Sequence, residues 1–182
     1  MNDYTFMGTT YNMSHLAPCT KEYKLTLNPP TQSKKVQLLV EYTNHCYSRS
    51  LGEDEAVDSQ HCIHDGSRQG PRRRIFDQQR YDLSLTLNER IDTLLISGEK
   101  VWSTPHGNFF AIPKSLAIAT DYVLFIKATV LEPAQPKIPK RCVSFKVQSA
   151  YPYTEPADFW NGAKPSSLNS YMFHLWTGRT VK

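Results

Sequence analysis

The sequence lacks the features that mark membrane and secreted proteins. It contains no run of about 18 apolar residues and no positively charged start followed by an apolar stretch. We therefore expect neither a membrane span nor a signal peptide, and we expect a cytoplasmic protein. Only four cysteines are present in 182 residues, and they are too scattered for the disulfide framework of a small secreted domain.

Motifs for nucleotide-driven chemistry and internal repeats are also missing. The chain has neither a P-loop nor a glycine-rich dinucleotide-binding fingerprint. It has no self-similarity at a period of about 20–50 residues, which argues against a solenoid or a propeller. A length of 182 residues with 40% apolar content suits one ordinary core, so we predict a single domain over residues 1–182.

The charge of the chain is mildly basic. Its 21 lysines and arginines exceed its 17 acidic residues and give a formal net charge of +4. This charge suits a polyanionic partner such as a nucleic acid, although it falls short of that of a dedicated nucleic-acid packaging protein.

The hydrophobic pattern predicts an α+β fold. Alternating apolar residues predict an N-terminal hairpin of Glu22–Asn28 and Val36–Thr43. Near-helical spacing predicts a short turn at 77–84 and then one principal helix to about Ser97, ended by Gly98. Thr86-x-x-Glu89 has the pattern of a capping box.

The rest of the chain returns to strand patterns. Five further strands are expected at Lys100–Ser103, Asn108–Ile112, Tyr122–Val130, Arg141–Ser149 and Tyr171–Trp176. We predict that the principal helix packs on an antiparallel sheet of four to five strands, in addition to the N-terminal hairpin.

Residues 44–76 are predicted to form an irregular charged loop within the domain. Between residues 44 and 80 the chain gathers three of its six histidines, two of its four cysteines and six of its nine arginines. The loop is acidic first and basic later, and Gly66, Gly70 and Pro71 argue against a regular element. Loops on a rigid scaffold often carry binding or catalytic side chains.

A late strand ends in Val147-Gln148-Ser149-Ala150-Tyr151-Pro152 after a helix and a meander of strands. In this order and ending, residues 72–152 resemble the barnase/EndoU/colicin/RelE superfold of metal-independent ribonucleases. The blocks Arg80-Tyr81-Asp82-Leu83-Ser84 and Gly107-Asn108-Phe109-Phe110 resemble uncharacterised phage and mobile-element proteins. The resemblance implies an endoribonuclease that acts on RNA without a cofactor, although the loop ahead of it departs from the superfold's pattern.

Metal-free RNA cleavage requires a base, an acid and cationic donors for the phosphorane charge. His106, in a polar turn between strands, and His45, after the second hairpin strand, are our acid and base candidates. Arg74 and Arg80 are candidate phosphate clamps, and Tyr151 could add a neutral hydrogen bond. The alternative is that both histidines are turn residues without a chemical role.

The arginines near the end of the loop are the predicted nucleic-acid contacts. They are Arg68, Arg72, Arg73, Arg74 and Arg80. Guanidinium groups match phosphate oxygens in a bidentate manner and stay charged at any working pH. The alternative is an ordinary solvated basic loop.

A zinc site is a weaker alternative. Its five possible ligands would be His45, Cys46, His61, Cys62 and His64. Zinc needs four nitrogen or sulfur ligands in a tetrahedron, but adjacent His-Cys pairs rarely direct both side chains at one ion. We therefore expect no metal cofactor.

The last alternative is a protein without enzymatic activity. A small basic α+β domain with arginines and aromatic residues could bind nucleic acid or a protein partner, for example as an inhibitor or accessory of a nucleic-acid-targeting complex. The two functions differ in one respect: catalysis requires a histidine, Arg80 and a hydroxyl group to converge in one concave patch.

Overall fold

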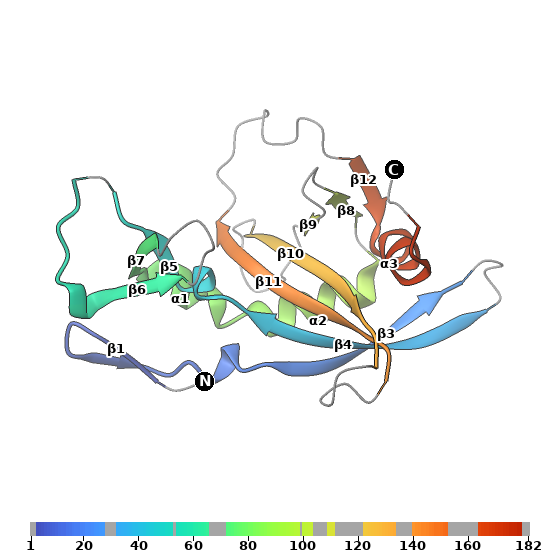
Figure 1. Cartoon of the computed structure of the whole chain (residues 1–182), viewed down its shortest axis with the longest axis horizontal. Helices are drawn as coiled ribbons and strands as arrows, with labels where there is room; N and C mark the ends of the chain where they lie inside the picture. The colour runs from blue at the N-terminus through green and yellow to red at the C-terminus, as the bar shows by residue number, and fades with distance from the viewer. Residues whose placement is uncertain are drawn as a thin grey trace.

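A seven-stranded β-sheet runs through the centre of the molecule, with helices against one of its faces (Figure 1). The computed structural model describes residues 3–27, 32–52, 54–65, 72–98, 100–103, 109–111, 122–133, 140–152 and 164–179. Across the sheet the strands are β12 (Lys164–Ser167), β8 (Lys100–Ser103), β9 (Phe109–Ala111), β10 (Tyr122–Leu131), β11 (Cys142–Pro152), β4 (Ser33–Tyr42) and β3 (Cys19–Thr26). The predicted α+β class is confirmed.

The N-terminal hairpin is confirmed as well, because β3 and β4 pair in antiparallel register from Cys19 opposite Val40 to Thr26 opposite Ser33. The hairpin belongs to the same sheet as the five later strands. All neighbouring strands are antiparallel except β11 and β4, which run parallel with Val143 beside Leu38. We expected an antiparallel sheet, and this pair departs from it; a parallel pair needs a long connection between its strands, which the chain between β4 and β11 supplies.

Strand alternation separates an apolar inner face from a polar outer face. On β4 the residues Val36, Leu38, Val40 and Tyr42 are buried, as the period of two requires for a strand with one face in the core. They meet α2 (Leu87–Ser97) and α3 (Leu168–Thr177) in one hydrophobic cluster. Both helices therefore lie on the inner face.

The principal helix has the predicted C-terminus and begins after residues 77–84, as expected, but it lacks the predicted capping box. Gly98 follows α2 with φ of 62°, the left-handed conformation that closes many helices. Thr86 is the N-cap residue, yet its hydroxyl donates to the Leu83 carbonyl and makes no capping bond. The capping box is therefore wrong, because α1 (Gln78–Ser84) ends directly before it and uses the threonine hydroxyl.

Residues 171–176 are helical, so the strand predicted there is wrong. Ser167 caps α3 by accepting a hydrogen bond from the Ser170 amide at 3.1 Å. Leu168, Tyr171, Met172 and Trp176 then point into the core at helical spacing. The continuous aromatic and apolar run suggested a strand, since short apolar runs carry no clear period.

A second, smaller sheet forms within the segment predicted to be irregular. It has the order β5 (Ser48–Ser50), β7 (Arg72–Phe76) and β6 (Cys62–Asp65), with short 3-10 turns η2 (Asn44–Cys46) and η3 (Ser59–His61) beside it. The N-terminal strands β1 (Tyr4–Phe6) and β2 (Thr9–Tyr11) pair with each other, and η1 (Ser14–Leu16) follows them. Strands of three to five residues are too short to show an alternation that sequence reasoning could detect.

Aromatic rings join this small sheet to the pair of strands β1 and β2. Phe76 lies 4.3 Å from Tyr11, 5.3 Å from Phe6 and 5.7 Å from Tyr4, measured between ring centroids. Such tilted or offset pairs add to the stability gained from burial. Among the helices of the described part of the chain, none has the length and apolar character needed to cross a membrane.

Candidate nucleic-acid interface

Arg74, a predicted phosphate clamp, is a buried part of the small sheet. Its side chain is 5% exposed. The guanidinium group donates to the Ser48 hydroxyl at 2.9 Å, to the Ser48 carbonyl at 2.6 Å and to the Ser50 hydroxyl at 3.3 Å. These bonds fasten β7 to β5, which is a structural task.

Arg80, in α1, binds η2 and the first residue of β5. Asp77 caps α1 by accepting the Arg80 amide at 2.9 Å, and the Arg80 guanidinium donates to the carbonyls of His45 at 3.2 Å and Ser48 at 3.1 Å. The structure therefore brings Arg74, Arg80 and His45 together. It does so through main-chain carbonyls, since His45 accepts the Arg80 hydrogen bond with its backbone oxygen.

The other predicted catalytic residues are placed only in part. His106 lies outside the described residues. Tyr151 belongs to β11, where it pairs with Val123 of β10. The joint site of His106, His45, Arg74, Arg80 and Tyr151 therefore stays a prediction.

The remaining arginines of the predicted nucleic-acid set lie along β7 or before it. Arg68 lies outside the described residues, and Arg72 begins β7. Arg73 is exposed and donates to the Val57 carbonyl at 3.4 Å. Nearby Arg49 donates to both carboxylate oxygens of Glu55, from Nη1 at 2.7 Å and from Nη2 at 2.5 Å, and this pairing lowers the pKa of Glu55 to about 2.

The five possible zinc ligands are distributed over separate elements. His45 and Cys46 belong to η2, whereas His61, Cys62 and His64 belong to η3 and β6. The Cys46 thiol is fully buried against the Val147 carbonyl, and burial raises its pKa to about 12. The Cys62 thiol contacts the Asp58 carbonyl. Within the described ranges, no three His, Cys, Asp or Glu side chains gather as a metal site.

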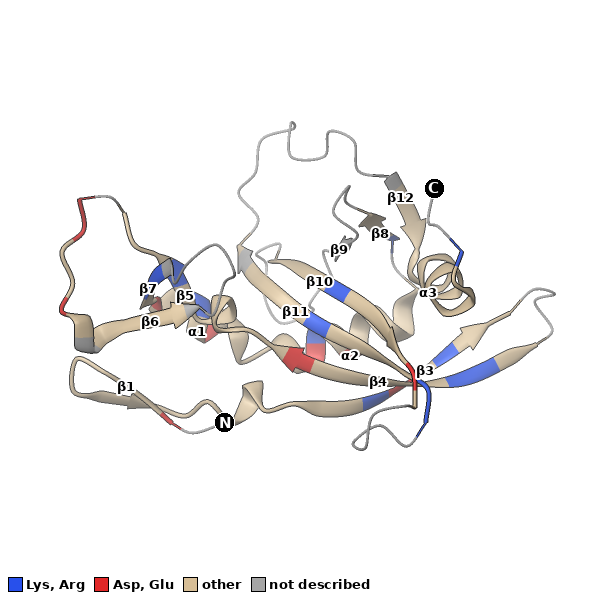
Figure 2. Cartoon of the chain, viewed as in Figure 1, with Lys and Arg blue, Asp and Glu red and all other residues tan. Residues whose placement is uncertain are grey.

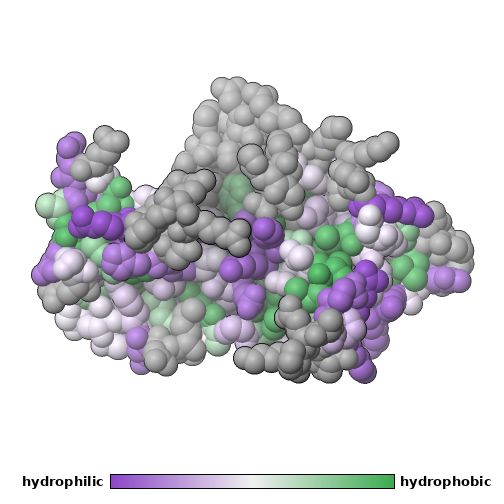
Figure 3. All heavy atoms as spheres, viewed as in Figure 1, coloured by the Kyte–Doolittle hydropathy of each residue, from purple (hydrophilic) through white to green (hydrophobic). Residues whose placement is uncertain are grey.

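The outer face of the large sheet carries a set of cationic residues that the sequence reasoning missed. We call it the lysine face and define it by Lys24, Lys35, Lys127, Lys140 and Lys146. All five are exposed, and Figure 2 shows blue segments on β3, β4, β10 and β11. Figure 3 shows hydrophilic side chains gathered over the middle of the same side of the molecule.

Two pairs of these lysines lie directly opposite each other on neighbouring strands. Lys127 of β10 is opposite Lys146 of β11, and Lys24 of β3 is opposite Lys35 of β4. The acidic residues on the same outer face are Glu22, which pairs with Lys35 at 2.8 Å, and Glu41, which lies beside Lys146. Five lysines against two glutamates leave the face with an excess of three positive charges.

Strand alternation contained the signal for this face. In β3, β10 and β11 the lysine alternates with buried apolar neighbours, for example Ile126 and Ala128 beside Lys127, and in β4 the lysine precedes the buried Val36. The pairing of distant strands, which brings the lysines side by side, could not be read from one strand at a time.

Neither the curated proteins nor the solved structures contain a match to this chain. The resemblance to the ribonuclease superfold therefore stays a prediction. A model of the YjaZ family matches residues 3–176, which is nearly the whole sequence, and the chain therefore belongs to the YjaZ family.

Proposed function

We propose that this chain is a nucleic-acid-binding module that binds single-stranded RNA on the lysine face. The observation that carries the proposal is the pair Lys127 and Lys146, directly opposed at the centre of the sheet. Like charges opposite each other destabilise a sheet by up to about 1 kcal/mol. An anionic ligand would remove this penalty, because each ammonium group would then face a phosphate.

Single-stranded nucleic acid suits the shape of the surface. A sheet face is broad, and sheets that bind RNA commonly bind unpaired strands laid across them. From Lys35 to Glu41, which lies beside Lys146, β4 advances six residues, or about 20 Å at ~3.3 Å per residue. A stacked strand with a phosphate every 3.4 Å would place about six phosphates over that length.

The burial of Arg74 and the internal hydrogen bonds of Arg74 and Arg80 favour binding over cleavage. A phosphate clamp needs guanidinium groups that are open to the ligand. Arg74 is buried, and both Arg74 and Arg80 bind main-chain carbonyls. The endoribonuclease activity implied by the resemblance would require these donors to leave their present partners.

The test is fluorescence anisotropy with a labelled single-stranded RNA of about 12 nucleotides, in chelator and at several salt concentrations. We expect salt-sensitive binding by the native chain. The double variant Lys127→Gln/Lys146→Gln should bind more weakly, and its slope of log affinity against log salt should shrink by about 1.4, since each phosphate contact contributes ~0.7 for single strands.

Two controls locate the site and separate binding from catalysis. Arg179→Gln removes one positive charge beyond the end of α3, on the helix side, and should leave the slope unchanged. Arg73→Gln probes the arginine end of the small sheet in the same way. Unchanged affinity of the double lysine variant would refute the proposed site, and RNA cut in the presence of chelator would support the ribonuclease instead.

A further inference from the structure

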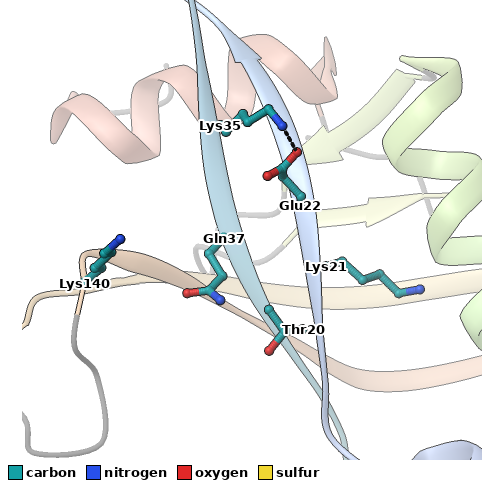
Figure 4. A pocket seen from close by; sticks show the side chains of 6 residues that line it. All are labelled: Thr20, Lys21, Glu22, Lys35, Gln37 and Lys140. Atoms are coloured by element: carbon teal, nitrogen blue, oxygen red, sulfur yellow. Dashed lines mark ion pairs between the residues drawn. The ribbon is translucent and has the colours of Figure 1, made fainter.

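A shallow groove lies at one end of the lysine face. It encloses about 430 Å³ and is formed by β3, β4 and the residue that leads into β11 (Figure 4). Its lining residues are Thr20, Lys21, Glu22, Lys35, Gln37 and Lys140. Sites for small ligands commonly range from about 300 to 1,000 Å³. The groove is therefore large enough for one nucleobase and its sugar.

The charges of the groove are partly neutralised within the protein. Lys21 points away from the other lining residues in Figure 4 and pairs with Asp92 of α2 at 2.6 Å. Lys35 pairs with Glu22 across the β-hairpin at 2.8 Å. Lys140 is exposed on the opposite rim and forms no ion pair with any residue in the described ranges. It is the cation best placed to bind an incoming phosphate.

The floor of the groove presents a hydrogen-bonding pattern instead of an apolar surface. Gln37 lies directly opposite Glu22 in the strand register, and Thr20 lies on the same face two residues from Glu22. The Gln37 carboxamide offers a donor and an acceptor side by side. This is the arrangement that matches the N6 amino group and N7 of adenine.

We infer that this groove binds an adenine base of the RNA strand, with Gln37 on its N6/N7 edge and Lys140 on the adjacent phosphate. The inference rests on the proposed function, since the groove is continuous with the lysine face through Lys35. It adds base preference to a surface whose lysines alone recognise only the backbone. The adenine preference and the salt-dependent affinity are thus assigned to different side chains.

The test compares anisotropy titrations with adenine, uracil and cytosine homo-oligonucleotides of about 12 nucleotides at one salt concentration. The native chain should prefer the adenine oligonucleotide. Gln37→Leu should reduce that preference by roughly 5-fold or more, as expected for one bidentate base contact. Lys140→Gln should weaken binding to all three oligonucleotides alike.

A matched variant tests whether the effect belongs to the groove. Gln32→Leu changes an exposed glutamine that precedes β4 and does not line the groove, so it should keep the native preference. Far-UV circular dichroism should show that the variants are folded. Equal affinity for the three oligonucleotides, or a preference that survives Gln37→Leu, would overturn the inference alone. Absence of binding to any oligonucleotide would overturn the proposed function as well.

Discussion

Replacement of Arg74 distinguishes a structural arginine from a phosphate ligand. In the structure its guanidinium group donates three hydrogen bonds, two to Ser48 and one to Ser50, and the side chain is 5% exposed. Arg74→Ala removes all three bonds and leaves a space beside β5. The variant should therefore lose stability.

The magnitude follows from the partners that the acceptors keep. The Ser48 carbonyl still accepts from Arg80 at 3.1 Å, and the Ser48 hydroxyl still donates to the Asn44 carbonyl at 2.7 Å. Each lost bond then costs its net value of about 0.5–1.5 kcal/mol. For these three bonds, we expect the free energy of unfolding to fall by about 1.5–4.5 kcal/mol.

Urea denaturation followed by circular dichroism measures this loss. With an m-value of about 2 kcal/mol/M, the midpoint should fall by ~1–2 M. Arg74→Lys should recover only part of the loss, because an ammonium group cannot reproduce the planar set of donors. The neighbouring exposed Arg73→Ala is the control and should change stability by no more than about 0.5 kcal/mol.

RNA affinity measured in native buffer completes the experiment. The buried guanidinium group should contribute little to affinity, so the folded Arg74→Ala protein should bind RNA almost as the native chain does. Native stability combined with a large loss of RNA affinity would refute the structural role and return Arg74 to the phosphate clamp that the sequence predicted.

Three further predictions concern acid stability, a helix end and thiol reactivity. Arg49 depresses the pKa of Glu55 to about 2, so the stabilising effect of the ionised carboxylate is complete above its ordinary pKa of 4.5 and is lost as the pH falls toward about 2. Glu55→Gln should therefore make the free energy of unfolding less dependent on pH in this range, and an unchanged dependence would contradict the pairing. Gly98→Ala should lower the free energy of unfolding, measured by heat or urea, by about 1 kcal/mol, because residue 98 has a φ of 62°. A variant that is more stable than the native chain would show that this helix end is not left-handed. Cys46 is fully buried, and burial raises the pKa of its thiol to about 12. Mass spectrometry should therefore find this thiol unmodified by iodoacetamide in native protein and modified after unfolding, and rapid modification of the native protein would contradict the buried position.

The fold was predictable where a long element carries one clear period. The strands expected at Val36–Thr43 and Tyr122–Val130 correspond to β4 and β10, whose apolar side chains alternate or run continuously, and the helix that ends before Gly98 has leucines at helical spacing. Short elements and pairings between distant strands were not predictable. Ser48–Ser50 has only three residues, and the parallel partner of β4 comes from the other end of the chain.

The candidate site was harder to predict because residue type does not reveal direction. Arg74 and Arg80 have the chemistry of phosphate ligands, but Arg74 is buried and both bind main-chain carbonyls within the fold. The lysines are dispersed in the sequence and did not indicate a site. They form one surface only after β10, β11, β4 and β3 are placed side by side.

The parallel pairing of β11 with β4 has a consequence for biosynthesis. Thr43, directly after β4, donates to the Gln148 carbonyl across a sequence separation of 105 residues. During translation the N-terminal hairpin can form early, but the long edge of β4 must wait for β11 to leave the ribosome. Until then β4 presents an open edge with the apolar residues Val36, Leu38 and Val40 beside it, which makes the nascent chain vulnerable to intermolecular strand pairing. Efficient production of this protein should therefore depend on how quickly its C-terminal half follows, and fragments that end before residue 140 should aggregate.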